Sequence, residues 1–392
     1  MKYLILILIN FLSFNCFALE KENLPQDLRE MSKKGMDYIY SIELDKAQSQ
    51  FEEIIKKYPE HPIGHFGIAM TKWAYYEYLE DQGDQKMDDE YANLTDKAIE
   101  IGKKWLKLHP NDATAHMCMG GMYGLRARLN LTQHSWLKAY VNGKRALSSM
   151  RKSLEIDDKM YDAYLGLGMY EYSAGTLPSV IRWLSKLLIS GDAQKGIDYL
   201  KICKEKGYFN SIAAELILIE IFTEHDGKYA NPKLAVEWSR ELRKIYPYHA
   251  QMHFVEIVSL YEAKMYEEAR TEMLEYLNRV GKYPHYKENY LSRIYTALGT
   301  IYMMEKNYDK ALEYFEKAKK RIEIDKKASR WSLWAIVRIG NVYDMENLRD
   351  RALSYYKEAL SYKDYWGFKE YIEDYIDKPF NISLLPVQLP PP

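Results

Sequence analysis

Small and aromatic residues recur along the chain at spacings that place them on one face of a helix. Two stretches show the pattern in full, Leu298-Gly299, Tyr302, Ala311, Phe315 and Ala318 in the first and Ile339-Gly340, Tyr343, Ala352, Tyr356 and Ala359 in the second. In each stretch a glycine and an alanine leave room where two helices cross, and the aromatic rings fill the space around the crossing. The pattern therefore predicts two pairs of helices, in which neither helix can bury its face alone.

Proline positions extend this pattern toward the start of the chain. Three alanines are each followed twelve residues later by a proline, which ends a helix and turns the chain. With the remaining, less regular copies, these alanines mark the second helix of eight successive pairs. The eight marker positions are Ala47, Ala98, Ala146, Gly196, Ala235, Ala269, Ala311 and Ala352.

The order of Leu298-Gly299, Tyr302, Ala311 and Phe315 resembles the signature of the tetratricopeptide repeat, a helix-turn-helix unit. The resemblance covers residues 28–362. It implies an all-α fold, an α-α superhelix of about eight repeats whose concave groove is lined by the first helices. It also implies a scaffold that binds a protein or peptide partner and catalyses nothing.

Three consecutive repeats are longer than the 34 residues of that unit, because the markers up to Gly196 lie 51, 48 and 50 residues apart. The extra residues belong either to longer paired helices or to loops that project from one edge. Residues 75–80 and 125–140 have a helical pattern, so we expect lengthened hairpins.

The third insertion, residues 177–189, is the most apolar stretch outside the first residues of the chain, and Pro178-Ser179 suits a helix start. Around residues 160–215 the chain is weakly similar to the inclusion-body-clearance and mitochondrial outer-membrane family of tetratricopeptide proteins. That similarity implies a helical insert on a repeat scaffold and no chemistry.

The composition agrees with a helical protein and excludes one class of partner. The chain is 47% hydrophobic and 28% charged, with only 20 Gly and 13 Pro in 392 residues, too few turn formers for an all-β fold. Lys plus Arg (55) balances Asp plus Glu (56), so the chain lacks the basic surplus of a general nucleic-acid binder.

Both ends of the chain differ from the repeats. Residues 1–18 combine a short positive start with an apolar stretch and predict a signal peptide cut after Ala18, hence export to the periplasm or secretion. A lipid anchor at Cys16 is the minority alternative. Residues 19–362 then form the solenoid, residues 363–378 a capping helix, and residues 379–392 an extended, mobile tail rich in proline.

Candidate chemistry is sparse. His249 and His253 have the i, i+4 spacing of metal ligands, but His253 stands where other repeats carry an aromatic residue, so we interpret it as packing. Metalloprotease, phosphate-loop and serine-hydrolase motifs are absent from the sequence. Cys118 and Cys203 fall on packed helix positions and predict free, buried thiols. We therefore expect no catalytic residue, metal or cofactor.

The remaining candidates face the predicted groove. Arg293, Arg338 and Asn341 resemble part of the basic and amide cluster with which some tetratricopeptide repeats hold a peptide carboxylate, although Val255, Val258 and Thr296 stand where that cluster needs other polar residues. Solvated groove residues are the alternative interpretation. We expect replacement of Arg338 and Asn341 by alanine to weaken partner binding and to leave stability nearly unchanged. The other groove candidates are Trp73, Met117 and Tyr172.

The sequence thus predicts an exported scaffold that binds a protein or peptide in its concave groove. The alternative is a peripheral membrane or lipid-handling protein that contacts a membrane surface through residues 177–189. The oligomeric state is left open.

Overall fold

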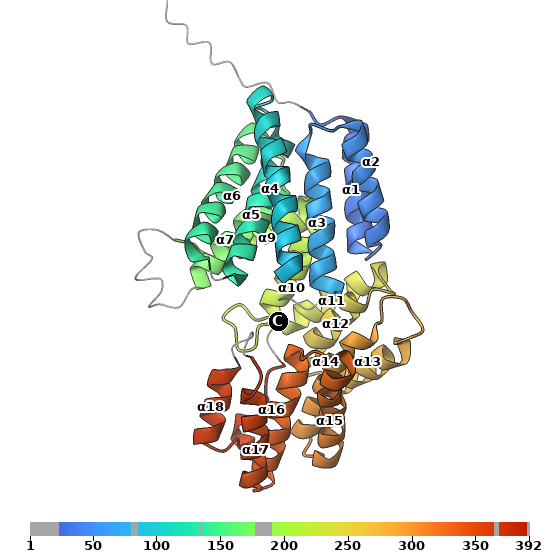
Figure 1. The fold of residues 1–392 in the computed structure, drawn as a ribbon, viewed down its shortest axis with the longest axis vertical. Helices are drawn as coiled ribbons and strands as arrows, with labels where there is room; N and C mark the ends of the chain where they lie inside the picture. The colour runs from blue at the N-terminus through green and yellow to red at the C-terminus, as the bar shows by residue number, and fades with distance from the viewer. Residues whose placement is uncertain (1–22, 80–84, 134, 177–189, 364–367, 390–392) are drawn as a thin grey trace, which may run out of the picture. The chain divides into compact units, whose positions relative to one another are not determined.

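The computed structural model describes residues 23–79, 85–133, 135–176, 190–363 and 368–389 (Figure 1). All helices and turns discussed below lie within these ranges, and the described residues contain no β-strand. The chain divides between Ala214 and Glu215, inside helix α10 (Ser211–Phe222), into two compact units, which are described separately.

Unit 1 is built from antiparallel helices, drawn blue to green in Figure 1. Its helices are α1 (Gln26–Tyr40), α2 (Leu44–Lys57), α3 (Pro62–Leu79), α4 (Gln85–Leu108), α5 (Ala113–Thr132), α6 (Trp136–Ile156), α7 (Ala163–Thr176) and α9 (Ala193–Lys206).

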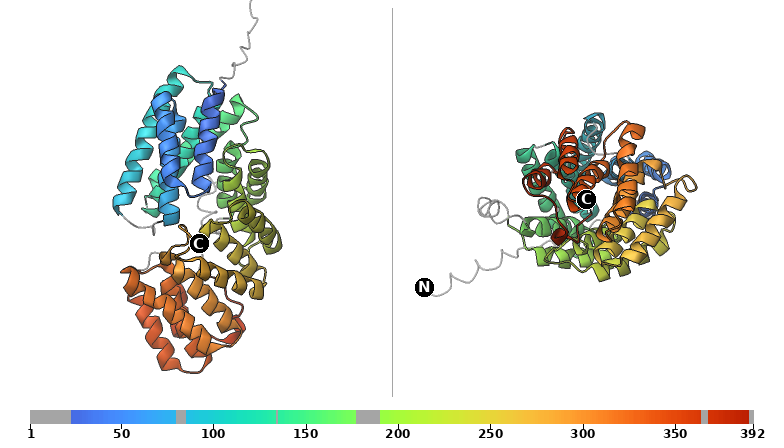
Figure 2. Two further views of the ribbon diagram at one scale, coloured as in Figure 1. Left: turned by 90° about the vertical axis from the view of Figure 1, so that its right-hand side faces the viewer. Right: turned by 90° about the horizontal axis from the view of Figure 1, so that it is seen from below.

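Unit 2 has the same construction and ends in a short extra helix. Its helices are α11 (Pro232–Ile245), α12 (Ala250–Glu262), α13 (Tyr266–Arg279), α14 (Leu291–Met304), α15 (Tyr308–Asp325), α16 (Arg330–Met345), α17 (Arg349–Leu360) and α18 (Lys369–Asp377). Within each unit, successive helices pack side by side as hairpins (Figure 2). The predicted all-α fold of stacked helical hairpins is therefore confirmed.

The eight marker positions lie one each on α2, α4, α6, α9, α11, α13, α15 and α17. All are buried except Ala146, which is half-buried. The hairpin turns repeat as well. Lys264, Lys306 and Asn347 each lie five residues before a marker and each adopt a left-handed backbone conformation, with φ of 61°, 60° and 61°. The repeat is thus present in the backbone as well as in the packing.

The predicted helix crossings follow the expected steric rule. A β-carbon at Gly299 on α14 would lie 2.6 Å from the ring of Phe315 on α15, and one at Gly340 on α16 would lie 2.4 Å from the ring of Tyr356 on α17. These contacts are too short for any real β-carbon. Glycine is therefore required because the aromatic ring of the second helix rests directly on the backbone of the first.

The first two insertions lengthen paired helices, as predicted. Helices α4, α5 and α6 have 24, 20 and 21 residues, whereas α14 has 14. The third insertion, residues 177–189, lies outside the described residues, and so does the predicted signal peptide of residues 1–18. None of the described helices combines the length and the apolar character needed to cross a lipid bilayer.

The C-terminal residues of unit 2 pack onto its earlier helices. Helix α18 lies within the predicted range 363–378, and its Ile372 is buried in a cluster that includes Tyr356 of α17. The residues that follow include a short 3-10 turn, η2 (Ile382–Leu384), and two of the last described side chains, Val387 and Leu389, are buried.

Candidate functional site

The predicted site residues fall into two sets, one in each unit. Arg293 lies on α14 and both Arg338 and Asn341 lie on α16, all in unit 2. Trp73, Met117 and Tyr172 lie on α3, α5 and α7 of unit 1. Every one of them is therefore on the first helix of a pair, as predicted.

Arg293 is held by aromatic rings. Its guanidinium group lies 4.4 Å from the ring centroid of Phe254 and 4.1 Å from that of Tyr290. It donates hydrogen bonds to the side chains of Gln251, at 2.8 Å, and Tyr276, at 3.1 Å. With 9% of its surface exposed, Arg293 is a packed residue of the α12–α14 region and no freely solvated group.

Arg338 and Asn341 belong to a buried polar chain. The Arg338 guanidinium donates to Asn341 Oδ1 at 2.9 Å, Asn341 Nδ2 donates to the Tyr356 hydroxyl at 2.9 Å, and that hydroxyl donates to Asp344 at 2.8 Å. Arg338 is 3% exposed and Asn341 0%. The interpretation of these residues as solvated is wrong, because each polar group has an internal partner.

Asp344 is the hub of this series of buried hydrogen bonds, because it accepts from several residues. The sequence pattern did not indicate its role. Its carboxylate accepts two hydrogen bonds of 2.9 Å from Arg349 and one of 2.9 Å from the main-chain nitrogen of Phe380. Arg349 also donates to the main-chain oxygens of Tyr375 and Ile376. Burial and the neighbouring Asp344 raise the pKa of the Tyr356 hydroxyl, so it stays protonated and donates. The hub fastens the end of α18 to α16.

Beyond Phe380 the chain reaches the first helices of earlier hairpins. The Tyr261 hydroxyl on α12 donates to the main-chain oxygen of Val387, and Arg338 on α16 donates to that of Gln388 at 3.1 Å. The expectation of a mobile tail is wrong for these residues, because side chains of two separate helices hold two consecutive main-chain positions.

The side chains of this segment alternate. Val387 is 7% exposed and Leu389 5%, whereas Pro386 is exposed and Gln388 half-buried. Val387 lies in a cluster with Tyr302, Met303 and Ile339, and Leu389 lies in a second cluster that includes Phe254, Ile257 and Leu298. We call residues 387–389 the tail segment, and the face of α12, α14 and α16 that it contacts the inner face of unit 2.

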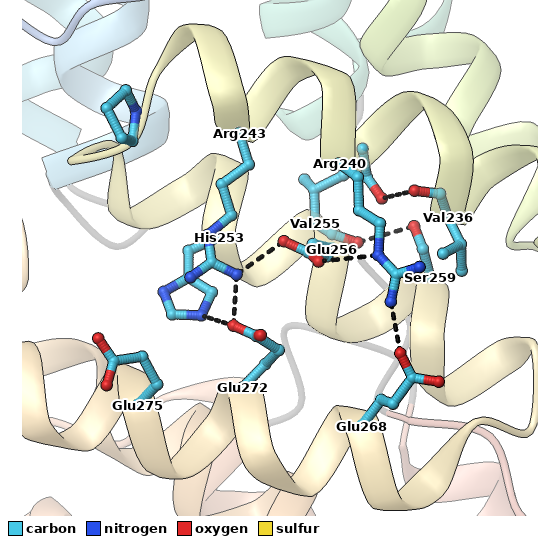
Figure 3. Close-up of polar contacts among 12 residues, drawn as sticks. Val236, Arg240, Arg243, His253, Val255, Glu256, Ser259, Glu268, Glu272 and Glu275 are labelled. Carbon is cyan, nitrogen blue, oxygen red and sulfur yellow. Dashed lines mark hydrogen bonds and ion pairs between the residues drawn. The ribbon is translucent and has the colours of Figure 1, made fainter.

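A second polar network, drawn in Figure 3, joins α11, α12 and α13. Arg243 donates to Glu256 at 2.7 Å and to Glu272, and Arg240 donates to Glu256 at 3.3 Å and to Glu268 at 2.6 Å. Each carboxylate is paired with an arginine. The network therefore ties three helices together and leaves no unpaired carboxylate among its members for proton transfer.

His253 belongs to this network and behaves as a packing residue. Its ring lies against Tyr276 and Tyr286, with hydrogen bonds of 3.0 Å to the Tyr286 hydroxyl and to Glu272. Burial lowers its pKa. The hydrogen bond from His253 and the charge of Arg243 lower the pKa of Glu272 to about 2. Over the described residues, no three His, Cys, Asp or Glu side chains are grouped as a metal site would require.

In unit 1 the candidates pack between helices. Met117 is fully buried, and Trp73 lies beneath the guanidinium of Arg128 at 4.7 Å and beside the ring of Tyr91 at 5.6 Å. Tyr172 is half-buried, and a β-carbon at Gly196 would lie 2.4 Å from its backbone nitrogen. Trp73 thus contacts side chains of two neighbouring helices, and the backbones of α7 and α9 approach each other closely at Tyr172 and Gly196.

Comparison with known proteins agrees with the repeat pattern. A family model described as tetratricopeptide repeat matches residues 290–363, which span the two stretches with the full pattern. No curated protein matches the chain.

Three solved structures illustrate the fold likeness. A Rap protein complexed with Competence and Sporulation Factor is 12% identical, with 90% of this chain and 80% of that chain covered and a TM-score of 0.44. Yeast Tom70 is 12% identical, with 86% of this chain and 70% of that chain covered and a TM-score of 0.39. The Cut9-Hcn1 complex is 14% identical, with 90% of this chain and 70% of that chain covered and a TM-score of 0.30. TM-scores this low carry no argument about what the chain binds.

Proposed function

We propose that this chain, a tetratricopeptide-repeat protein, is a non-catalytic scaffold that binds an extended segment of a partner protein on the inner face of unit 2. One observation carries the proposal. The tail segment lies on this face as a bound peptide would, with its main chain held by side chains of Tyr261 and Arg338 and its apolar side chains in two separate clusters.

The chemistry of the face suits a peptide. Side-chain donors that bind main-chain carbonyl groups recognise an extended backbone whatever its sequence, and apolar pockets at alternate positions select the side chains. Arg338 supplies a charge-assisted hydrogen bond to the main chain. These are binding contacts. Arg338 and Asn341 are also hydrogen-bonded to internal partners, which fixes their orientation toward the tail segment.

A library of random peptides, displayed against the immobilised chain, tests this proposal. We expect selected peptides to slow amide hydrogen exchange in α12 and α16, and Arg338→Ala to abolish their binding, while the control Lys317→Ala on α15 leaves it unchanged. Peptides that bind with full affinity to Arg338→Ala and protect only other helices would overturn it.

We further propose that the protein is exported, which the positive and apolar residues 1–18 support. In a bacterial host with its own export machinery, the mature chain should begin at Leu19 when sequenced from its N-terminus. A chain that begins at an acylated Cys16 would replace this proposal with a lipid anchor, and an uncut chain in the cytoplasm would refute export.

A further inference from the structure

We infer, as an extension of the proposed function, that the tail segment is a ligand held in cis. On this view the inner face of unit 2 takes an extended, uncharged peptide with apolar residues at alternate positions and flanking prolines, and a partner's peptide must displace the chain's own tail. The inference rests on how the tail is attached, on its sequence, and on the groups that face it.

The tail is attached at two points along the chain, and Phe380 of the first and Val387 of the second belong to the same apolar cluster. The first is at Phe380, whose side chain is buried and whose main-chain nitrogen donates to Asp344 at 2.9 Å. The second is the tail segment itself. Between them lies the turn η2, whose Ile382 and Leu384 are 46% and 48% exposed. The second attachment can therefore be released while the first stays in place.

The hydrogen bonds that hold the tail segment could form equally well with a peptide from another protein. Tyr261 and Arg338 bind its main chain through hydrogen bonds, and such bonds are available to any extended peptide. Specificity resides in the two clusters that bury Val387 and Leu389. A valine and a leucine at alternate positions fill them, and the residue between them is half-buried.

The sequence around the tail segment indicates the class of ligand. No charged residue occurs between Lys378 and the last residue, Pro392, so the pockets accept neutral side chains. Pro386 precedes the tail segment, and three prolines follow it. A partner's peptide of this kind fits the same face without rearrangement of Arg338 or Tyr261.

Tethering gives the tail an advantage over a free peptide. A short flexible linker holds a segment at an effective concentration in the millimolar range, so a free peptide of equal intrinsic affinity competes poorly. The proposal therefore predicts that cutting the chain between the two attachments exposes the site to peptides in solution.

The experiment replaces the exposed residues Ile382–Leu384 with a protease recognition sequence and cuts the folded protein there. The probe is a fluorescent synthetic peptide of residues 385–392. By anisotropy, we expect the cut protein to bind it at least about tenfold more tightly than the uncut protein. A peptide with Val387→Asp and Leu389→Asp should not bind. In the cut protein, Tyr261→Phe should weaken binding about tenfold, consistent with a charge-free hydrogen bond.

The outcomes separate this inference from the proposed function. Equal affinities of cut and uncut protein, or a tail that stays with the cut protein and never exchanges with the probe, would overturn the inference. If library peptides still protect α12 and α16 in that case, the proposed function stands. If the altered turn prevents folding, the uncut full chain with Val387→Asp and Leu389→Asp is used in place of the cut protein. These changes should free the site, so the unaltered probe should bind to this variant.

Discussion

Arg338 on α16 and Gln388 near the end of the chain, 50 residues apart in sequence, are joined by a hydrogen bond of 3.1 Å from the guanidinium group to the main-chain oxygen. The same guanidinium donates to Asn341 at 2.9 Å. One side chain therefore connects the buried polar chain of α16 to the tail segment. Loss of its donors would leave the buried Asn341 Oδ1 and the main-chain oxygen of the half-buried Gln388 without this partner.

Arg338→Met should both destabilise the protein and free the tail. Methionine keeps the apolar length of the side chain but lacks its donors, so we expect a loss of about 1.5 to 3 kcal/mol in the free energy of unfolding. Amide exchange in residues 387–389 should become faster, because Arg338 no longer holds the main-chain oxygen of Gln388. Urea unfolding and hydrogen exchange measure the two effects. Arg351→Met on the exposed side of α17 serves as the control and should change neither.

Gly299→Ala should be destabilising although alanine favours helices. The added β-carbon would lie 2.6 Å from the ring of Phe315, and we expect a loss of roughly 1 to 3 kcal/mol by overpacking. Gly143→Ala on α6 is the matched control, since nothing lies within 4 Å of its β-carbon position. That change should stabilise by about 0.5 to 1 kcal/mol. Thermal melts in which both substitutions act in the same direction would contradict the packing described for α14 and α15.

The sequence predicted the hairpins because their contacts are local. Gly299 and Phe315 are 16 residues apart, and their spacing repeats at Gly340 and Tyr356. The tail offered no such signal. Val387 and Leu389 alone carry no helical period, and their partners lie on α12, α14 and α16. Tyr261 on α12, for example, is 126 residues before Val387.

Two errors about the site followed from that missing contact. Arg338 lies on the first helix of a pair, as the pattern predicts, but its hydrogen bond to Gln388 depends on a segment whose docking the sequence does not reveal. Asp344 was overlooked because one scattered carboxylate on a helix resembles any solvated one. Its role depends on Arg349 and Phe380, which approach it only in the folded unit.

Glu272 should make stability depend on acid pH. Its pKa is about 2 in the folded protein, below its ordinary value of 4.5, mainly because His253 and Arg243 bond to it. A lowered pKa stabilises the fold above pH 4.5, and this contribution is lost as the pH falls toward 2. Glu272→Gln should therefore cost roughly 1 to 3 kcal/mol at pH 7, allowing for partial exposure, and much less near pH 2.

Urea unfolding of both proteins across this range measures the difference. Asp27 also has a pKa of about 2, so only the difference between the two proteins isolates Glu272. A constant gap from pH 7 to pH 2 would show that the carboxylate is not held as described.

Cys118 and Cys203 should both be reduced and shielded. They lie on α5 and α9 as free, buried thiols, and burial raises the pKa of each. In a chain that begins at Leu19, we expect an aromatic disulfide reagent to react with neither thiol in the native protein and with both after denaturation without reductant. Detection of fewer than two thiols after denaturation would mean that they are oxidised.

The attachment of the tail to α12 and α16 changes how unit 2 comes apart. Stacked hairpins that touch only their neighbours can unravel stepwise from an end. Here the bond between Tyr261 and Val387 closes a loop that contains every helix from α13 to α18, so the last hairpin cannot fray without first breaking it. We therefore expect the helices from α13 to α18 to unfold cooperatively. A partner's peptide that bridged α12 and α16 would stabilise the same hairpins reversibly, for as long as it stayed bound.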